Sequence, residues 1–360
     1  MLKRLHLRNF TVFEDADFEF GPGLNVLVGT NGTGKSHVLK MGYAVETAHA
    51  GASWAMATDE SVAVNPRMVL AREVNSRLPK IFQSGNGALV RRTRNTSAAL
   101  PSPATVQAFF GVRSDKLVFN IRPAEKEIFP THVPPLHESS VKPVFIPAKE
   151  VLTMGWLPPM DALREVPIDQ TYLDLLRLLP VLTLKVPAPP VVPILRKLHK
   201  LIGGKVEEEG GRYYLAAPDQ PRMEMNLVAE GMRKFATLYK LLANGTLTPE
   251  TTLFWDEPEA NLNPALLKEM AAVLTELAHA GFQIILATHS LFLLKELHIL
   301  SQREKTAVKY FGLFAGPGGD TQVETKDDFV QLAHVAALDA ELAQTYDFED
   351  ALDQDYASDN

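Results

Sequence analysis

Residues 24–36 read LNVLVGTNGTGKS, and this stretch decides the fold. Its first five residues form a short apolar run typical of a buried parallel strand. Residues 29–36 form a glycine-rich loop, and residues 37–50 are compatible with a helix. The loop has the spacing G-x-x-x-x-G-K-[ST], which turns successive backbone N–H groups and the helix N-terminus toward a polyphosphate. The stretch therefore predicts a nucleotide-binding P-loop, with Lys35 on the β- and γ-phosphate oxygens and the Ser36 hydroxyl on Mg²⁺.

Two acidic residues end a second apolar strand, predicted at residues 252–255. Asp256 and Glu257 follow it directly. Because ligands bind at the carboxyl edge of parallel strands, we expect both side chains beside the P-loop. A cation would offset the cost of burying paired carboxylates, which favours Asp256 as a Mg²⁺ ligand and Glu257 as the group that polarises the attacking water. The alternative is an acid pair that caps the next helix.

A histidine follows a third predicted strand, residues 282–287. His289 would lie at the same sheet edge, within reach of a γ-phosphate. A lone histidine at a strand end is usually structural, but its position after the P-loop and the acid pair favours a functional role.

The other patterns predict a mixed α/β chain. Two alternating runs in residues 1–20 indicate paired strands. Further strands are predicted at 89–94, 116–121 and 141–146, a hairpin around 205–215, and helices at 230–243, 264–280 and after 290.

Composition excludes several classes of protein. The 360 residues include 36 lysines and arginines against 43 acids, a net charge of −7, with 46% hydrophobic residues, as in a soluble globular protein. The chain has no cysteine, which excludes disulfides, cysteine-based zinc sites and thiol catalysis. The most apolar stretch, 173–195, carries charges and five prolines, so we expect no membrane partner and a cytoplasmic location.

These motifs, in this order, resemble the ABC-type ATPase head. The first strand, LHLRNF at 5–10 with Phe13, is similar to the opening of the SMC and RecF families. WDEPEANLNP at 255–264 is similar to the Walker B motif and D-loop of stand-alone RecF/OLD-like ATPases, and ATHS at 287–290 to their switch histidine. The chain thus resembles a stand-alone ABC-type (SMC/RecF/OLD-like) AAA-family ATPase.

The resemblance implies a P-loop NTPase core with a mixed central sheet, an antiparallel β subdomain and a helical subdomain. No long coiled coil is expected, because the interval between Ser36 and Ala229 is rich in proline and has no sustained heptads. We divide the chain into ATPase lobe I (1–150, with the antiparallel β region), a proline-rich helical insertion with a β-hairpin (151–225), a lobe with the signature, Walker B, D-loop and switch histidine (226–345), and an acidic tail (346–360). The tail is either a solvated end or a docking site for a basic partner.

The resemblance also implies ATP and Mg²⁺ as cofactors. Glu257 would be the catalytic base and His289 the γ-phosphate sensor, while Ser36 and Asp256 would bind the metal. The other nucleotide-binding residues that it implies are Arg8, Asn31, Gly32, Thr33, Gly34, Lys35, His37 and Asn261. Gln83 and Gln107 are both candidates for the Q-loop glutamine.

The segment at 228–233, VAEGMR, stands where these ATPases carry an LSGGQ-like signature, which a partner subunit presents to the γ-phosphate. Ala229 replaces the serine of that signature. The signature residues implied to bind the nucleotide are Ala229, Glu230, Gly231 and Arg233. Losing one hydrogen-bond donor to a transition state can cost about 10²-fold in rate, so slow hydrolysis is expected.

The function implied is a switch that forms a homodimer, or a higher homo-oligomer, around two ATPs. It would control a separate effector, a nuclease or toxin, in bacterial antiphage defence. One alternative is a RecF-like DNA repair ATPase that binds nucleic acid through basic residues at 91–94 or 196–200. A transporter subunit and a P-loop kinase are the remaining alternatives.

Overall fold

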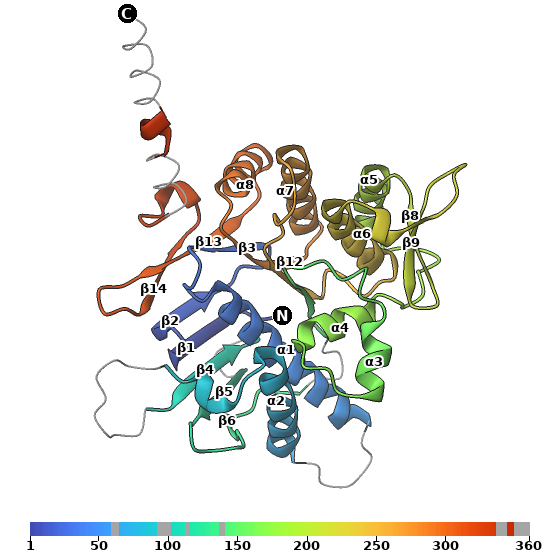
Figure 1. Cartoon of the computed structure of the whole chain (residues 1–360). Coiled ribbons are helices and arrows are strands. Elements are labelled where there is room, and N and C mark those ends of the chain that lie inside the picture. The colour runs from blue at the N-terminus through green and yellow to red at the C-terminus, as the bar shows by residue number, and fades with distance from the viewer. Residues whose placement is uncertain (59–64, 92–101, 112–114, 137–140, 336–343, 349–360) are drawn as a thin grey trace, which may run out of the picture.

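The structure, a computed structural model, describes residues 1–58, 65–91, 102–111, 115–136, 141–335 and 344–348. A six-stranded sheet lies at its centre, in the order β14-β13-β3-β12-β11-β7 (Figure 1). Its strands are β3 (Leu24–Gly29), β7 (Val144–Ile146), β11 (Thr252–Asp256), β12 (Gln283–Thr288), β13 (Val308–Ala315) and β14 (Thr321–Lys326). All neighbouring pairs are parallel except β13 and β14, so the sheet is mixed.

The central sheet separates two hydrophobic cores. Every residue of β3 and β12 is buried, which explains why these strands appear in the sequence as continuous apolar runs. Because side chains alternate along a strand, Ile285 and Ala287 enter one core while Ile284 and Leu286 enter the other. The carboxyl ends of the parallel strands therefore lie at a rim between two fully packed layers.

On one side of the sheet, two helices and a second sheet form the first core (Figure 1). The helices are α1 (Lys35–Thr58) and α2 (Pro66–Phe82). The second sheet is antiparallel, in the order β2-β1-β4-β5-β6. Its strands are β1 (Arg4–Phe10), β2 (Phe13–Glu19), β4 (Ala104–Phe109), β5 (Lys116–Ile121) and β6 (Pro130–His132). This is the predicted antiparallel β region.

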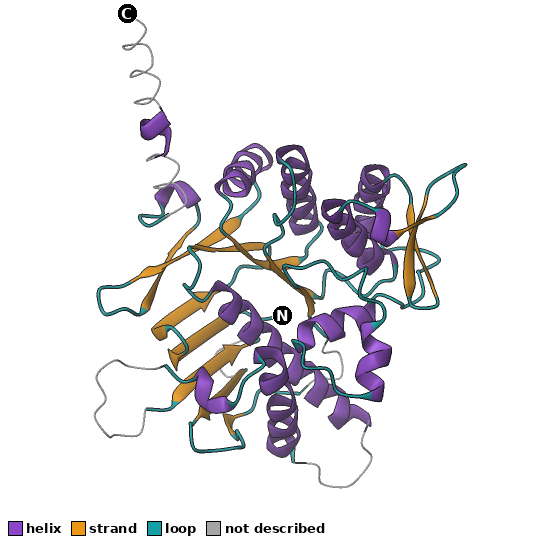
Figure 2. Cartoon of the chain, in the orientation of Figure 1, coloured by secondary structure: helices purple, strands orange, loops and turns teal. Residues whose placement is uncertain are grey.

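The other side is mostly helical, as the purple ribbons of Figure 2 show. Its helices are α5 (Val192–Ile202), α6 (Glu230–Ala243), α7 (Pro264–His279) and α8 (Leu291–Glu304). A small antiparallel sheet of β8 (Lys205–Glu209), β9 (Arg212–Ala216) and β10 (Met223–Glu224) lies beside them. Two further helices, α3 (Leu157–Leu163) and α4 (Gln170–Leu178), lie at the edge of the sheet beside β7, where α4 also contacts α1 and α2 (Figure 1). Short 3-10 turns are η1 (Asn86–Leu89), η2 (Pro189–Val191), η3 (Met225–Leu227) and η4 (Phe329–Gln331).

The predicted elements around the motifs are confirmed, and one strand was wrong. Residues 89–94 were predicted as a strand, but Leu89 ends η1 and Val90 makes only an isolated bridge to Phe10. Residues 92–94 lie outside the described part of the chain. The first helix starts at Lys35 rather than at residue 37, which places Lys35 and Ser36 in its first turn.

The predicted division of the chain stays a prediction, although its segments interlock in space. Residues 144–146 of the first segment form β7, which pairs with β11 of the third. The insertion at 151–225 contributes α3, α4, α5 and the small sheet. Of the acidic tail, only residues 346–348 are described. No described helix is both long and apolar enough to cross a membrane.

Candidate active site

The P-loop connects β3 to α1 at the carboxyl edge of the central sheet. Gly34 has φ +90°, and a Cβ there would lie 2.7 Å from the Phe13 ring, so only glycine fits. The Lys35 ammonium donates to the carbonyls of Gly29 at 2.7 Å and Thr30 at 2.9 Å. Burial lowers the pKa of Lys35, while the charge of Glu257 opposes this shift. The loop is thus closed around a cation that faces the predicted acid pair.

The turn between β1 and β2 supports the P-loop from the side of the antiparallel sheet. The Nδ1 atom of His37 lies 3.1 Å from the Thr11 hydroxyl, and its ring lies near Phe82. Burial lowers the pKa of His37. Arg8 is exposed on β1, opposite Asp15 of β2. Within the loop, Asn31 and Gly32 are exposed, and Thr33 is buried with its hydroxyl bonded to Thr30.

Asp256 ends β11 next to the P-loop serine. Burial raises the pKa of its carboxyl group, and a hydrogen bond from the Ser36 hydroxyl lowers it. The Oδ1 atom of Asp256 is buried and has no hydrogen-bond partner. A buried carboxylate oxygen without a partner is costly unless a cation or donor reaches it. Asp256 and Ser36 therefore present oxygen donors of the type that Mg²⁺ prefers.

Glu257 adopts an uncommon backbone conformation at the rim. Its φ is +48°, in the left-handed region that residues other than glycine seldom adopt. Its N–H donates to the Ala287 carbonyl of the neighbouring strand at 3.0 Å. Its Oε1 atom lies 3.3 Å from the Nδ1 atom of His289. The backbone geometry thus brings two of the sequence-predicted residues into contact.

Glu259 is a residue of the candidate site that the sequence patterns did not single out. Its Oε1 atom accepts from the Thr288 hydroxyl at 2.6 Å and from the backbone N–H of His289 at 3.1 Å. The side chain is buried, and its Oε2 atom has no hydrogen-bond partner. Glu259 therefore connects the predicted D-loop to the predicted switch histidine. The only sequence signal was a third acid two residues after Glu257.

The predicted signature forms the start of α6 and contacts the D-loop of the same chain. Ala229 is the N-cap residue of α6 and supplies no side-chain hydrogen bond. The Asn261 amide donates to Glu230 at 2.8 Å. A Cβ on Gly231 would lie 2.8 Å from the Asn261 carbonyl oxygen, so the two segments approach closely.

The side chain of Arg233 is directed into the protein. Its Nη1 atom lies 2.6 Å from Oε2 of Glu150, and its Nε atom donates to the Val228 carbonyl at 2.9 Å. Both side chains of the ion pair are largely buried, at 16% and 5% exposure. A role for Arg233 at a partner's phosphate, which stays a prediction, would require it to leave this pair.

Neither candidate for the Q-loop glutamine contacts these residues in the structure. The Gln83 amide donates to the carbonyls of Lys80 and Ile168, and Gln107 lies in β4 opposite His6. The segment that follows β7 reaches the site instead, through Glu150. This contact could not be predicted locally, because it joins residues 83 positions apart in the sequence.

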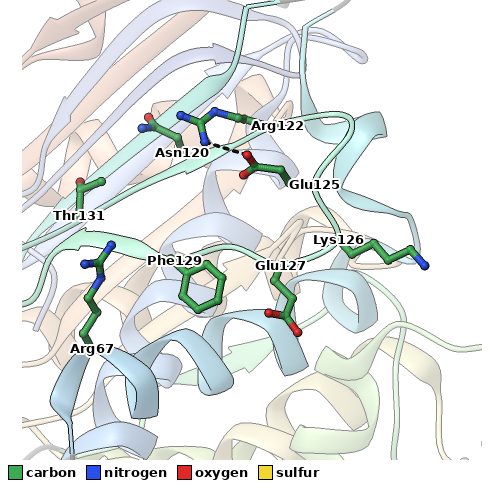
Figure 3. Close-up of a pocket in the computed structure, with 8 residues that line it drawn as sticks. All are labelled: Arg67, Asn120, Arg122, Glu125, Lys126, Glu127, Phe129 and Thr131. Carbon is green, nitrogen blue, oxygen red and sulfur yellow. Dashed lines mark hydrogen bonds and ion pairs between the residues drawn. The ribbon is translucent and has the colours of Figure 1, made fainter.

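A pocket of about 760 Å³ lies away from the P-loop, between α2 and the strands β5 and β6 (Figure 3). Its charges are mixed, and Arg122 pairs with Glu125 at 2.9 Å within it. None of the sequence-predicted site residues lines this pocket. Its lining consists of Arg67, Asn120, Arg122, Glu125, Lys126, Glu127, Phe129 and Thr131.

Comparison with protein families identifies the chain. A family model described as "AAA domain, putative AbiEii toxin, Type IV TA system" matches residues 116–295, half of the chain. The chain belongs to this AAA family. A second model, described as "AAA domain", matches residues 4–41, which include the P-loop. A comparison with curated proteins finds no match.

Solved structures of SMC heads are similar to this AAA domain. An SMC head bound to the C-winged helix domain of ScpA has a TM-score of 0.51 and 15% identity, covering 90% of this chain and 97% of that one. The SMC head domain from Thermotoga maritima has a TM-score of 0.48 and 13% identity, covering 90% of this chain and 98% of that one. An SMC head with an extended coiled coil, derived from Pyrococcus furiosus, has a TM-score of 0.49 and 13% identity, covering 90% of this chain and 96% of that one. The similarity to the ScpA-bound head shows an SMC-head-like fold and confirms the predicted fold class.

Proposed function

We propose that this AAA protein is a Mg²⁺-dependent ATPase that works as an ABC-type switch. One observation carries the proposal. The P-loop, the buried carboxylate of Asp256 beside Ser36, and the contact between Glu257 and His289 all lie at one edge of the central sheet. Ligands of open α/β sheets bind at this edge.

The residues divide the chemistry of ATP hydrolysis among them. Lys35 and the first turn of α1 bind the β- and γ-phosphates. Ser36 and Asp256 would hold Mg²⁺, which supplies positive charge to the phosphate oxygens when it is bound. Glu257 accepts a proton from the attacking water as the water oxygen bonds to the γ-phosphorus and the bond to the leaving ADP oxygen breaks. His289 contacts the γ-phosphate and holds the Glu257 carboxylate in place.

The start of α6 suits a phosphate presented by a second subunit. Ala229 gives no side-chain cap to the start of this 14-residue helix, although the Met232 N–H donates to the Ala229 carbonyl. The uncapped N-terminus carries the partial positive charge that favours an anion. We infer a head-to-tail homodimer in which each signature at 229–233 meets the partner's P-loop. ATP binding closes this dimer, and hydrolysis opens it.

We place this switch in the cytoplasm, in control of a separate effector, a nuclease or toxin, in antiphage defence. The family description, which reads "putative AbiEii toxin, Type IV TA system", supports a place in a toxin–antitoxin pair. The similar SMC head, bound to a domain of ScpA, shows that a head of this fold can bind a protein partner. The matches do not favour the RecF-like alternative.

The test compares two glutamates at opposite ends of β11. Glu257→Gln removes the base and keeps the shape of the side chain, whereas Glu250→Gln alters an exposed residue before the strand. Light scattering measures the mass with and without Mg-ATP, and phosphate release measures turnover. We expect Glu257→Gln to lose turnover and double its mass only with ATP, while Glu250→Gln hydrolyses like the wild type. A mass of Glu257→Gln that does not respond to ATP would refute the dimer.

A further inference from the structure

The predicted signature helix α6 is tied to the catalytic strand of its own chain by a lysine outside every motif described above. Lys234 is the fifth residue of α6, and its side chain is only 2% exposed. Its ammonium donates to the backbone carbonyl of Glu257 at 2.8 Å. This contact joins segments 23 residues apart, and the proposed ATPase mechanism does not use it.

The hydrogen bond from Lys234 completes the fixation of the Glu257 peptide backbone. The Glu257 N–H is already held by the Ala287 carbonyl of β12. The Glu257 carbonyl accepts from the Ala260 N–H at 3.1 Å within the turn and from Lys234 on the side of α6. Glu257 needs this support because its left-handed backbone is unfavourable and persists only where the surroundings impose it. The direction of the Glu257 side chain toward His289 depends on that backbone.

The placement of Lys234 is not explained by packing alone. Burying an ammonium group costs free energy unless nearby groups compensate. Four carboxylates favour its charge, namely Glu259, Glu230, Glu257 and Asp256. Lys240, two turns further along α6, is similarly buried, but it faces Glu208 of the small sheet. Lys234 is thus the buried cation of α6 that lies beside the acid pair.

We propose that Lys234 is a positioning residue that couples the signature helix to the Glu257 base of the same chain. The proposal rests on the proposed dimer, in which the start of α6 contacts the partner's ATP. Contact at one ATP site then moves α6, and Lys234 conveys that movement to the base of the other site. Two ATP sites are thereby linked through each subunit.

A double-mutant cycle tests this coupling. Lys234→Met keeps the length of the side chain and removes the donor, and Lys240→Met is the matched control on the same helix. We expect Lys234→Met to lower kcat by about 10- to 100-fold with KM changed less than twofold, because displacement of a catalytic group by about 1 Å has effects of this size. Lys240→Met should keep the kcat of the wild type.

The second readout separates positioning from simple damage to α6. Because Lys234→Met leaves the signature in place, ATP should still double the mass of this variant. The dimer should then persist while ATP is bound, as is expected of Glu257→Gln. In the Glu257→Gln background, Lys234→Met should lower single-turnover rates less than twofold, since the residue acts through Glu257.

The outcomes separate the two proposals. Equal kcat values for Lys234→Met and Lys240→Met would overturn the coupling and leave the ATPase proposal intact. The same conclusion would follow if the fold-losses of Lys234→Met and Glu257→Gln multiplied in the variant that carries both changes. Unchanged turnover in Glu257→Gln alone would instead overturn the assignment of the base.

Discussion

Replacing Lys234 by methionine should make the protein more stable at neutral pH while it loses activity. Burial lowers the pKa of Lys234 from 10.5 to about 8, even though the surrounding carboxylates oppose this shift. At about 1.4 kcal/mol for each pKa unit, the buried charge costs the folded state about 3 kcal/mol. Losing the hydrogen bond to the Glu257 carbonyl destabilises the variant by about 1 kcal/mol, which offsets part of this gain. A net gain of about 2 kcal/mol remains, or a few degrees in Tm.

Calorimetry of both proteins from pH 7 to pH 10.5 tests this reasoning. Below pH 8 the ammonium is charged in the folded and unfolded states, so the full cost is present. Between pH 8 and 10.5 the folded chain releases the proton first, and the cost disappears as pH rises. The difference in the free energy of unfolding between Lys234→Met and the wild type should therefore fall to within about 1 kcal/mol at pH 10.5. A less stable Lys234→Met protein at pH 7, or a gap independent of pH, would refute the argument.

Two further substitutions probe the site from either side. Arg233→Met leaves the buried carboxylate of Glu150 without its cation, which should cost about 3 kcal/mol and lower Tm by several degrees in thermal melts; an unchanged Tm would mean that the pair is dispensable. Gly34→Ala places a Cβ 2.7 Å from the Phe13 ring and should abolish ATP binding in a fluorescent-nucleotide titration. Gly32→Ala is its control, because that position shares a positive φ but has nothing within 4 Å, so it should weaken binding much less.

The sequence predicted the parts of the site that follow buried strands. The P-loop, Asp256, Glu257 and His289 each come directly after a continuous apolar run, and parallel strands bring such ends to one edge. The sequence patterns predicted four strands of the central sheet, β3, β7, β11 and β12, whereas β13 and β14 were not predicted. The prediction of a strand at 89–94 failed at its start, because Leu89 ends a 3-10 turn and Val90 makes only an isolated bridge to Phe10.

The residues that were missed depend on long-range contacts. Glu150 meets Arg233 across 83 positions of sequence, and Glu259 meets Thr288 across 29. Lys234 occupies a position where a charged residue in an amphipathic helix ordinarily faces solvent. Only the packing of α6 against the end of β11 turns it inward, and no local pattern encodes that packing.

The Arg233–Glu150 pair has a consequence for the long insertion between them. Residues 151–227 run from Glu150 to the signature and place buried side chains in the helical core, so the pair fastens the two ends of this segment together. The segment is therefore part of the packed core rather than a separable loop, and any force applied to it reaches β7 and α6 together.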